Sequence, residues 1–529
     1  MKPFPIYRTS LIGIAAFLLG LFLSRDGIVV WDDWEHIRHS QWLLSHFGGT
    51  PPSEDPTMIM KWYGPLWEII MGVFSFVVFG FLKDPAAVRH ALTFALFPLT
   101  LWFVYLYLQG AGVSKSRSLL AIASLFGLIR WGGHALINTK DFPFSAAFLL
   151  VTLALWTDLK MELERKSFSP WIWVKIGIFS IVPYLLRPPV TLHFVGLCIF
   201  LGALAVIGPP PNRTRWLKAL GISVLSALIF TLITYPTIRE LGFGMWMDSF
   251  RLFGQFPWIG PVRYYGEVYR SDQLPHWYAF GWIPLVMLWP VFFLVLVGLG
   301  SAGLKKSAKQ SSELRITLAG RSLSFTLRSW IALITALAWL AVLVKNPVLY
   351  DEERHLLFLY PPLVLLAVLY CPAWKALYDK GAALFICLLA LWSYGNWGHY
   401  SYVYQSPLMG RPNSLRFMGD YWGACVGPAM TALKGRVPAQ SSISIIGPAG
   451  IGPVQLQRLN ESLLLKDSGY EGFHFVDISK LQKPVTIIGI NRIGMTDQLQ
   501  QAVAVGAAQK VLEVDMPPED VACLAVFIK

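Results

Sequence analysis

The chain has 529 residues, of which 55% are apolar and 14% charged, and its mean hydropathy is +0.52. Soluble domains are about 25% charged, so this composition excludes a string of soluble domains and indicates a polytopic membrane protein. The net charge of +13 does not indicate a nucleic-acid partner, because Lys and Arg occur in short clusters between apolar runs, as loop charges of membrane proteins do.

Twelve apolar segments follow one another along the chain, and we expect each to be a membrane-associated helix. Lys2 and Arg8 precede the first segment and no small-x-small cleavage site follows it, so we interpret it as an uncleaved signal anchor. The sequence shows no internal repeat, which removes a signature of many secondary transporters. The segments are approximately 9–24, 65–82, 88–108, 118–137, 142–157, 171–187, 189–207, 216–235, 279–300, 329–345, 355–370 and 380–396.

The second segment, 65–82, decides the orientation of all later loops. If it crosses the membrane, four later basic clusters lie outside, whereas they return to the cytoplasm if it lies along or dips into the outer face. The positive-inside rule favours the second arrangement, and Glu68 together with the stretch 62–67 (WYGPLW) gives the segment an interfacial composition. We therefore expect about eleven transmembrane helices plus an outer juxtamembrane helix, with the polar segments discussed below on the outer side. The four clusters are Lys115/Arg117, Lys160/Arg165/Lys166, Arg213/Arg215/Lys218 and Lys305/Lys306/Lys309.

An acidic pair follows the first apolar run, where residues 30–36 read VWDDWEH. Adjacent carboxylates repel one another and are costly to remove from water. One interpretation is a solvated helix start, where Asp is favoured as a cap. The other is that Trp31 and Trp34 anchor at the headgroup level and hold Asp32 and Asp33 at the membrane surface, where a carboxylate can act as general base toward a hydroxyl. The residues alone leave both interpretations open.

Two further polar segments carry the same ambiguity. Residues 134–145 read HALINTKDFPFS, in which Asp141 is either a helix cap or a second carboxylate that converges on the first, with Lys140 available to an anion. Residues 350–362 read YDEERHLLFLYPP, in which Arg354 and His355 can grip a phosphate at the membrane edge, while Asp351 to Glu353 can equally be salt-bridged loop charges.

Isolated Arg and Cys residues, and the absence of known catalytic motifs from the sequence, limit the classes of reaction that the protein can catalyse. Arg89 and Arg187 each stand at the outer end of a span, where snorkelling explains a lone Arg without a ligand. The five Cys form no CxxC pair, and we expect Cys425 and Cys523 to be free thiols, with a disulfide between them as the alternative. No P-loop, GxSxG, HExxH or HxxxH motif is present, so ATP-driven chemistry, serine hydrolysis and zinc peptidase action have no support.

The order and spacing of these polar segments resemble a known family. The acidic pair opens the first outer loop, an aromatic-Gly-Pro-Leu stretch starts the juxtamembrane segment, an Arg begins the next span, an acidic residue follows the third span, and an Arg-His pair precedes a Tyr-Pro sequence late in the chain. The membrane region thereby resembles the polyprenyl-phosphate-sugar-dependent glycosyltransferases with the C-type fold, the group that contains protein O-mannosyltransferases and the lipid A aminoarabinose transferase. The matching stretches are 32–33, 63–66, 89, 138–144, 256–258, 265–266, 274–278, 354–355 with 360–363, 399–404 and 420–423.

The resemblance implies a sugar transfer from a polyprenyl-phosphate donor to an acceptor hydroxyl or phosphate on the non-cytoplasmic side, with inversion through a single displacement. The leaving group is then a phosphate, and cations at the membrane edge stabilise its developing charge. The expected phosphate-binding residues are Arg89, Lys140, Arg187, Arg354 and His355.

The resemblance also assigns roles to the carboxylates. Asp32 is the expected base or orienting group and Asp141 the second candidate, while Asp33 stands where the family often has Glu, which leaves its role open. The resemblance leaves room for a divalent cation near these acids, but no ligand spacing identifies one. The residues expected to contact substrate are Tyr63, His276, Tyr278, Asp351 and Glu352.

We expect two domains, a transmembrane glycosyltransferase domain at 1–396 and an extracytoplasmic α/β domain at 397–529, whose expected role is to help bind the acceptor. Its strands are predicted at 442–446, 474–478 and 486–490 and its helix at 498–511. The bacterial-type loops favour a bacterial inner membrane, with the site facing the periplasm, over the lumen of the endoplasmic reticulum.

Two other functions are compatible with a polytopic protein. An O-antigen-type ligase uses a pyrophosphate-linked donor and is expected to keep its Arg and His in one late loop, whereas acids here follow the first and third spans. A transporter or flippase of lipid-linked sugars predicts charges near mid-membrane, and these spans carry few. No motif encodes the sugar or tells whether the acceptor is a protein, lipid A or a polysaccharide.

Overall fold

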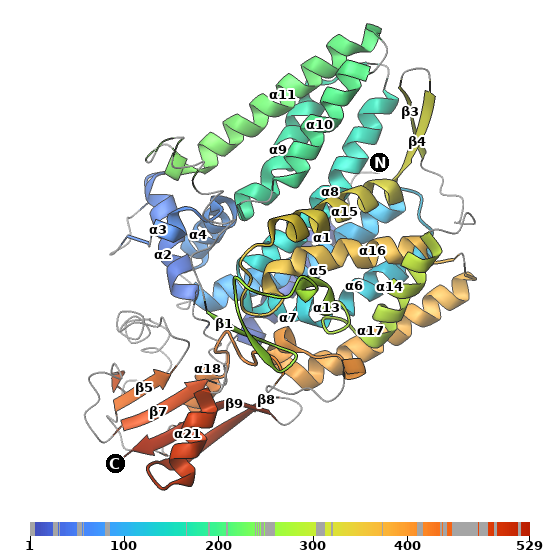
Figure 1. The fold of residues 1–529 in the computed structure, drawn as a ribbon. Coiled ribbons are helices and arrows are strands. Elements are labelled where there is room, and N and C mark those ends of the chain that lie inside the picture. The colour runs from blue at the N-terminus through green and yellow to red at the C-terminus, as the bar shows by residue number, and fades with distance from the viewer. Residues whose placement is uncertain are drawn as a thin grey trace.

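The computed structural model places a bundle of apolar helices above a small sheet (Figure 1). The residues that the structure describes are 6–24, 30, 32–49, 55–56, 58–79, 85–165, 167–188, 191–207, 210–238, 240, 242, 244, 248, 260–302, 313–318, 321–372, 374–409, 416–433, 436, 442–446, 474–475, 485–490, 495–516 and 520–528. The fold class predicted from the sequence, a helical polytopic membrane protein with a C-terminal α/β part, is confirmed.

Every predicted apolar segment overlaps at least one helix. The helices are α1 (Ile6–Ser24), α2 (Asp33–Ser45), α3 (Met58–Lys61), α4 (Pro65–Phe79), α5 (Pro85–Gly110), α6 (Lys115–Phe126), α7 (Ile129–Ile137), α8 (Asp141–Glu164), α9 (Pro170–Leu186), α10 (Leu192–Ile207), α11 (Pro210–Thr234), α13 (Tyr278–Gly281), α14 (Trp289–Ala302), α15 (Leu327–Lys345), α16 (Tyr360–Tyr370), α17 (Ala376–Trp397), α18 (Val426–Leu433) and α21 (Met495–Ala504), with short 3-10 helices η1 (Arg354–Leu359), η2 (Gly398–Val403) and η3 (Pro407–Met409).

Six helices in the described part of the chain are long and apolar enough to cross a membrane, or seven if α6 and α7, bent by 62° at their junction, form one span. Five further apolar helices are shorter, and α4 with its 15 residues is one of them. A straight crossing takes about 20 residues. The expected total of eleven crossings therefore stays a prediction, as does the placement of α4 along the outer face.

The two ends of α8 mark the two faces of the helical part. Its 24 residues span about 36 Å. At its C-terminal end, Arg215 of α11 donates a 2.8 Å hydrogen bond to the carbonyl oxygen of Glu162, so two of the basic clusters meet there. At its N-terminal end, Asp141 pairs with Arg187, which directly follows α9. Basic clusters and polar site residues thus occupy opposite ends of the same helices.

A close backbone approach explains the Tyr-Gly-Pro-Leu stretch before α4. A Cβ atom on Gly64 would lie 2.3 Å from the carbonyl carbon of Leu186, so only glycine lets this turn pack against the end of α9. The packing brings Tyr63 to the segment that carries Arg187.

The C-terminal sheet has five strands in the order β6-β5-β7-β9-β8. Strand β5 (Ser442–Ile446) pairs in parallel with β6 (His474–Phe475) and β7 (Val485–Ile490), while β9 (Asp520–Ile528) pairs antiparallel with β7 and with β8 (Gln509–Met516). Leu499 of α21 packs on Ile487, Leu524 and Val526 of β7 and β9. Figure 1 shows this sheet at the opposite end of the molecule from the β3–β4 hairpin (Glu313–Leu318 and Arg321–Thr326).

Several local predictions differ from the structure. The predicted helix 498–511 begins and ends too late, because the chain leaves α21 through Gly506 at φ +73° and then forms β8. The strands β8 and β9 and the two hairpins, β1–β2 (Pro261–Tyr264 and Glu267–Arg270) and β3–β4, were not predicted. Cys425 and Cys523, expected to be free thiols, form a disulfide with a Cα–Cα distance of 5.8 Å. The matching stretch 256–258, the basic cluster at 305–309 and part of the predicted strand 474–478 lie outside the described residues.

Candidate functional site

The candidate site is a group of paired charges where the start of α2, the α7–α8 turn and the start of η1 meet. One oxygen of Asp32 pairs with the Lys140 ammonium and lies 3.8 Å from an Nη atom of Arg354. Asp32 occupies the N-cap position of α2, yet its side chain makes no capping hydrogen bond. The carboxylate is therefore directed at two cations from distant segments. Burial raises the pKa of Asp32, but Lys140 and Arg354 outweigh it and hold that pKa well below its usual range.

Aromatic rings enclose the two cations. The Lys140 ammonium lies 5.4 Å from the ring centre of Tyr63 and 5.5 Å from that of Trp422. The Arg354 guanidinium lies 4.7 Å from the Trp422 ring and 4.8 Å from the Tyr350 ring. Cations held over aromatic faces keep their charge while losing much of their water, so the group is prepared to attract an anion.

Asp141 lies beside this group and pairs with Arg187. Asp141 is the first residue of α8 and not its N-cap, which is Lys140, and the side-chain oxygen of Asn138 accepts the backbone N–H of Asp141 at 2.9 Å. The Asn138 amide nitrogen in turn donates to the Asp141 carboxylate at 3.0 Å. The cap interpretation of Asp141 is thus wrong in detail, and its carboxylate fixes the position of Arg187.

The segment before η1 has an unusual backbone. Asp351 and Glu352 both have positive φ values, +55° and +59°, which non-glycine residues rarely adopt and which cost of order 1–3 kcal/mol each. This turn lets the Asp351 carboxylate face an Nη atom of Arg354 at 2.9 Å. The strained turn therefore places both charges of the pair at the site.

Three buried charged side chains, Arg130, Glu352 and Glu353, form ion pairs that hold that turn, and we call them the clamp. Arg130, at the start of α7, pairs with both Glu352 and Glu353, and all three side chains are 0% exposed. The guanidinium also donates to the carbonyl oxygen of Tyr404 at 2.5 Å. From the other side, the backbone N–H of Met418 donates to Glu352 at 2.8 Å. The salt-bridge interpretation of the acidic stretch therefore holds for Glu352 and Glu353, which pair with Arg130, and also for Asp351, which pairs with Arg354.

His355 is the last predicted cation of this segment. Its ring packs against Tyr350 at 4.5 Å between centres, and its Nε2 atom is buried with no hydrogen-bond partner among the described residues. A buried ring nitrogen next to Arg354 can accept or donate a hydrogen bond once a ligand enters.

Two predicted residues lie in a buried network between α2, α4 and α5, which borders the charged group through His36, whose ring centre lies 6.1 Å from that of Tyr63. Arg89 donates to Glu68 at 2.7 Å and to Ser40 at 2.8 Å, and Glu68 also bonds His36 at 2.8 Å. Asp33 pairs with His90 of α5 at 2.8 Å. Arg89 and Asp33 are therefore engaged with Glu68 and His90, and Glu68 is buried rather than interfacial. These pairs pack α2 and α4 onto α5.

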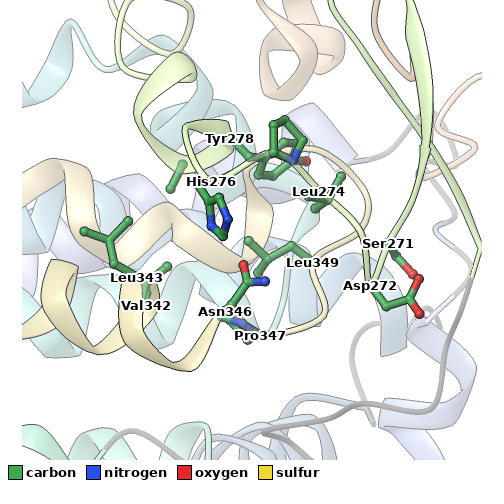
Figure 2. Close-up of a pocket in the computed structure, with 12 residues that line it drawn as sticks. Ser271, Asp272, Leu274, His276, Tyr278, Val342, Leu343, Asn346, Pro347 and Leu349 are labelled. Atoms are coloured by element: carbon green, nitrogen blue, oxygen red, sulfur yellow. The ribbon is translucent and has the colours of Figure 1, made fainter.

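Two further predicted contacts also lie elsewhere. Tyr278 is buried and donates its hydroxyl to the carbonyl oxygen of Glu352 at 2.9 Å, so it supports the strained turn. His276 lines a pocket between the 271–279 segment and the end of α15 (Figure 2). That pocket has a volume of only about 30 Å³, space for a water molecule but not for a sugar. His276 is thus outside the charged group.

Sequence reasoning missed three residues of the site or its support. Trp422 was predicted only as part of the matching stretch 420–423, and Tyr350 only as the first residue of the polar segment 350–362. Arg130 lay inside the predicted span 118–137. An Arg within an apolar span is a signal of function or buried pairing, so Arg130 was the one that the sequence could have singled out.

The described residues do not favour a metal centre here. No three His, Cys, Asp or Glu side chains among them are grouped to hold an ion. The site carboxylates of Asp32, Asp141 and Asp351 each face a Lys or Arg instead.

The clamp predicts a pH effect on stability. Burial raises the pKa of Glu352 to about 7 although Arg130 opposes the rise, and Glu353 adds to it. Because the folded state then binds more protons than the unfolded state between about pH 4.5 and 7, this contribution to stability is present at low pH and lost as the pH rises. Melting temperatures measured across this range are expected to fall for wild type relative to Glu352→Gln, with no further relative change above pH 8. A constant difference between the two proteins would contradict the shifted pKa.

Two structures of ArnT are among the solved structures that the chain is similar to. No protein-family model and no curated protein sequence matches the chain. ArnT from Cupriavidus metallidurans bound to undecaprenyl phosphate matches with a TM-score of 0.49 and 11% identity, over 100% of this chain and 98% of that chain. ArnT in the apo state matches with a TM-score of 0.47 and 11% identity, over 98% and 97% of the two chains. ArnT is the lipid A aminoarabinose transferase, a member of the group that the sequence motifs resemble.

Proposed function

We propose that the protein is a membrane glycosyltransferase that moves a sugar from a polyprenyl-phosphate donor to an acceptor hydroxyl or phosphate, with inversion. The observation that carries the proposal is the convergence of Lys140 and Arg354, from two distant segments, on the single carboxylate of Asp32. Two cations and a carboxylate are what transfer from a phosphate leaving group to a hydroxyl requires.

The proposed mechanism is one displacement. The donor phosphate binds Lys140 and Arg354 and takes the place of Asp32 as their anionic partner. The acceptor oxygen then attacks the anomeric carbon, and its bond to that carbon forms as the bond from the carbon to the phosphate oxygen breaks. Where the acceptor is a hydroxyl, Asp32 accepts its proton. The polyprenyl phosphate leaves with the bonding electrons, and the cations stabilise its charge. Asp141 positions Arg187 beside the same anion.

The proposed site faces the non-cytoplasmic side. Two observations support this orientation. Two basic clusters meet at the C-terminal end of α8, and the positive-inside rule places that end in the cytoplasm. Asp141 lies at the N-terminal end of the same helix. The Cys425–Cys523 disulfide belongs to the chain segment that follows the membrane helices, and disulfides persist in oxidising compartments such as the periplasm. A bacterial inner membrane with a periplasmic site fits both observations.

Donor binding and transfer test the proposal directly. Purified protein in nanodiscs would be incubated with radiolabelled polyprenyl-phosphate sugars, and both bound donor and label in protein, lipid A or polysaccharide fractions would be counted. Lys140→Gln is expected to weaken donor binding roughly ten- to hundredfold, since a hydrogen bond to a charged group contributes roughly 1.5–3 kcal/mol.

Lys175→Gln is the matched control, because Lys175 forms a similar 2.8 Å pair with Asp158 near the other end of α8. It is expected to bind the donor like wild type. Binding of a lipid-linked sugar that is never consumed, with any acceptor supplied, would favour a transporter or flippase instead. Use of pyrophosphate-linked donors only would favour a ligase.

A further inference from the structure

The loop 419–425 connects the charged site to the C-terminal sheet. Its shape is fixed by the buried Asp420, whose carboxylate accepts the backbone N–H groups of Ala424 and Cys425, both at 2.9 Å, and the hydroxyl of Tyr402. Gly419 and Gly423, at φ +71° and +72°, make the two sharp bends that this closed shape needs.

The loop presents Trp422 to the site. The indole ring is 3% exposed and lies within 5.5 Å of both the Lys140 ammonium and the Arg354 guanidinium. Its neighbour Tyr421 bonds His134 at 3.2 Å, which fixes the loop against α7. The Trp422 Nε1 atom is buried and has no hydrogen-bond partner among the described residues. A buried donor without an acceptor is costly, so a ligand oxygen is its natural partner.

The loop is also fastened covalently. Cys425, three residues after Trp422, forms the disulfide with Cys523 on β9. That strand lies inside the sheet, between β7 and β8. The disulfide therefore links the loop that carries Trp422 to a strand far along the chain, because Cys425 and Cys523 are 98 residues apart in the sequence.

We propose that Trp422 contacts the donor by donating its indole N–H to a phosphate oxygen between Lys140 and Arg354, and that the Cys425–Cys523 disulfide holds it in this position. The C-terminal sheet is then a structural part of the site. The phosphate is the expected partner because the indole N–H is grouped with two cations, and three donors of this kind select an anion. This inference rests on the proposed function for the identity of the anion.

Binding of polyprenyl phosphate without a sugar tests the contact independently of transfer. Trp422→Phe keeps an aromatic ring at this position but removes the N–H together with part of the indole, and it is expected to weaken polyprenyl phosphate binding about tenfold. Trp216→Phe is the matched control, since Trp216 lies 5.1 Å from the Arg215 guanidinium at the opposite face, and it is expected to bind like wild type. Equal binding by wild type and Trp422→Phe would overturn the contact while leaving the proposed transfer intact.

A double-mutant cycle tests the role of the disulfide. If the disulfide acts by positioning Trp422, Cys523→Ser weakens binding in the wild-type background but adds little to Trp422→Phe. Additive losses would overturn the positioning role. If Cys523→Ser does not fold, mild reduction of the folded wild type gives the same readout. Cys387→Ser, which removes a free thiol, is the control for the Cys523→Ser substitution.

The two proposals fail in different ways. Binding of polyprenyl phosphate that depends on the Trp422 N–H, without transfer of any sugar, would support the contact and overturn the transferase. If wild-type protein binds no polyprenyl phosphate, both are overturned.

Discussion

Asp32→Asn is expected to lower the rate of sugar transfer by roughly 10²–10⁴-fold, the usual contribution of a general base, while donor binding stays equal to wild type or becomes tighter. The amide has nearly the shape of the carboxylate but cannot accept the acceptor proton. It also carries no negative charge, so it no longer competes with the donor phosphate for Lys140 and Arg354. Turnover therefore falls without a loss of donor binding, which a purely structural residue would not cause.

The depressed pKa of Asp32 fits this role only when the donor is bound. In the resting site, Lys140 and Arg354 hold the pKa of the carboxyl well below its usual range, despite the opposing effect of burial, and such a carboxylate is a weak base. A phosphate that engages both cations removes their stabilisation of Asp32 and raises its basicity as the acceptor arrives. The proposed base is thus activated by the substrate whose reaction it assists.

Asp33→Asn is the matched comparison, because it makes the same chemical change one residue along the chain. Asp33 accepts the backbone N–H of Val30 at 3.1 Å and pairs with His90 at 2.8 Å. We expect a lower melting temperature without a selective loss of turnover. Steady-state rates, donor titration and thermal unfolding of both variants would check the pair. Full activity of Asp32→Asn would exclude Asp32 as the base and direct attention to Asp141.

A local signal in the sequence made three features predictable: the membrane class, the order of the apolar segments and the main charged residues of the site. Apolar runs and charge clusters are read along the chain, so Asp32, Lys140 and Arg354 could be named individually. Their pairing could not, since it depends on how distant segments pack. The same limit explains Arg89 and Asp33, whose partners Glu68 and His90 turn them into packing contacts.

The C-terminal part shows the limit of local signals more clearly. The strand 442–446 was predicted with the bounds it has, because its sequence SISII is rich in β-branched Ile, which favours a strand. The Cys425–Cys523 disulfide was only the alternative to two free thiols, because Cys523 lies on β9, a strand that the periodicity did not indicate. Without that strand nothing placed Cys523 near Cys425, or Trp422 near the cations.

Arg130→Leu is expected to destabilise the protein strongly, by about 3–5 kcal/mol, the usual loss when one partner of a buried ion pair is removed. The substitution leaves the carboxylates of Glu352 and Glu353 buried without their counter-charge, and it also leaves the carbonyl oxygen of Tyr404 without its donor. Thermal unfolding in detergent measures the effect. Arg130→Lys keeps the charge but cannot reach both carboxylates with a planar fork, so an intermediate loss is expected.

A compensated variant separates the stability role of Arg130 from its effect on the site. In the triple variant Arg130→Leu/Glu352→Gln/Glu353→Gln, no uncompensated charge is buried, so much of the lost stability is expected to return. Transfer activity is expected to stay low, because the left-handed turn at Asp351 and Glu352 loses the ion pairs that hold it and Arg354 is no longer fixed against Asp351. If the triple variant recovers activity together with stability, the clamp does not position Arg354. If activity stays low while stability returns, the strained turn is maintained for the sake of the site.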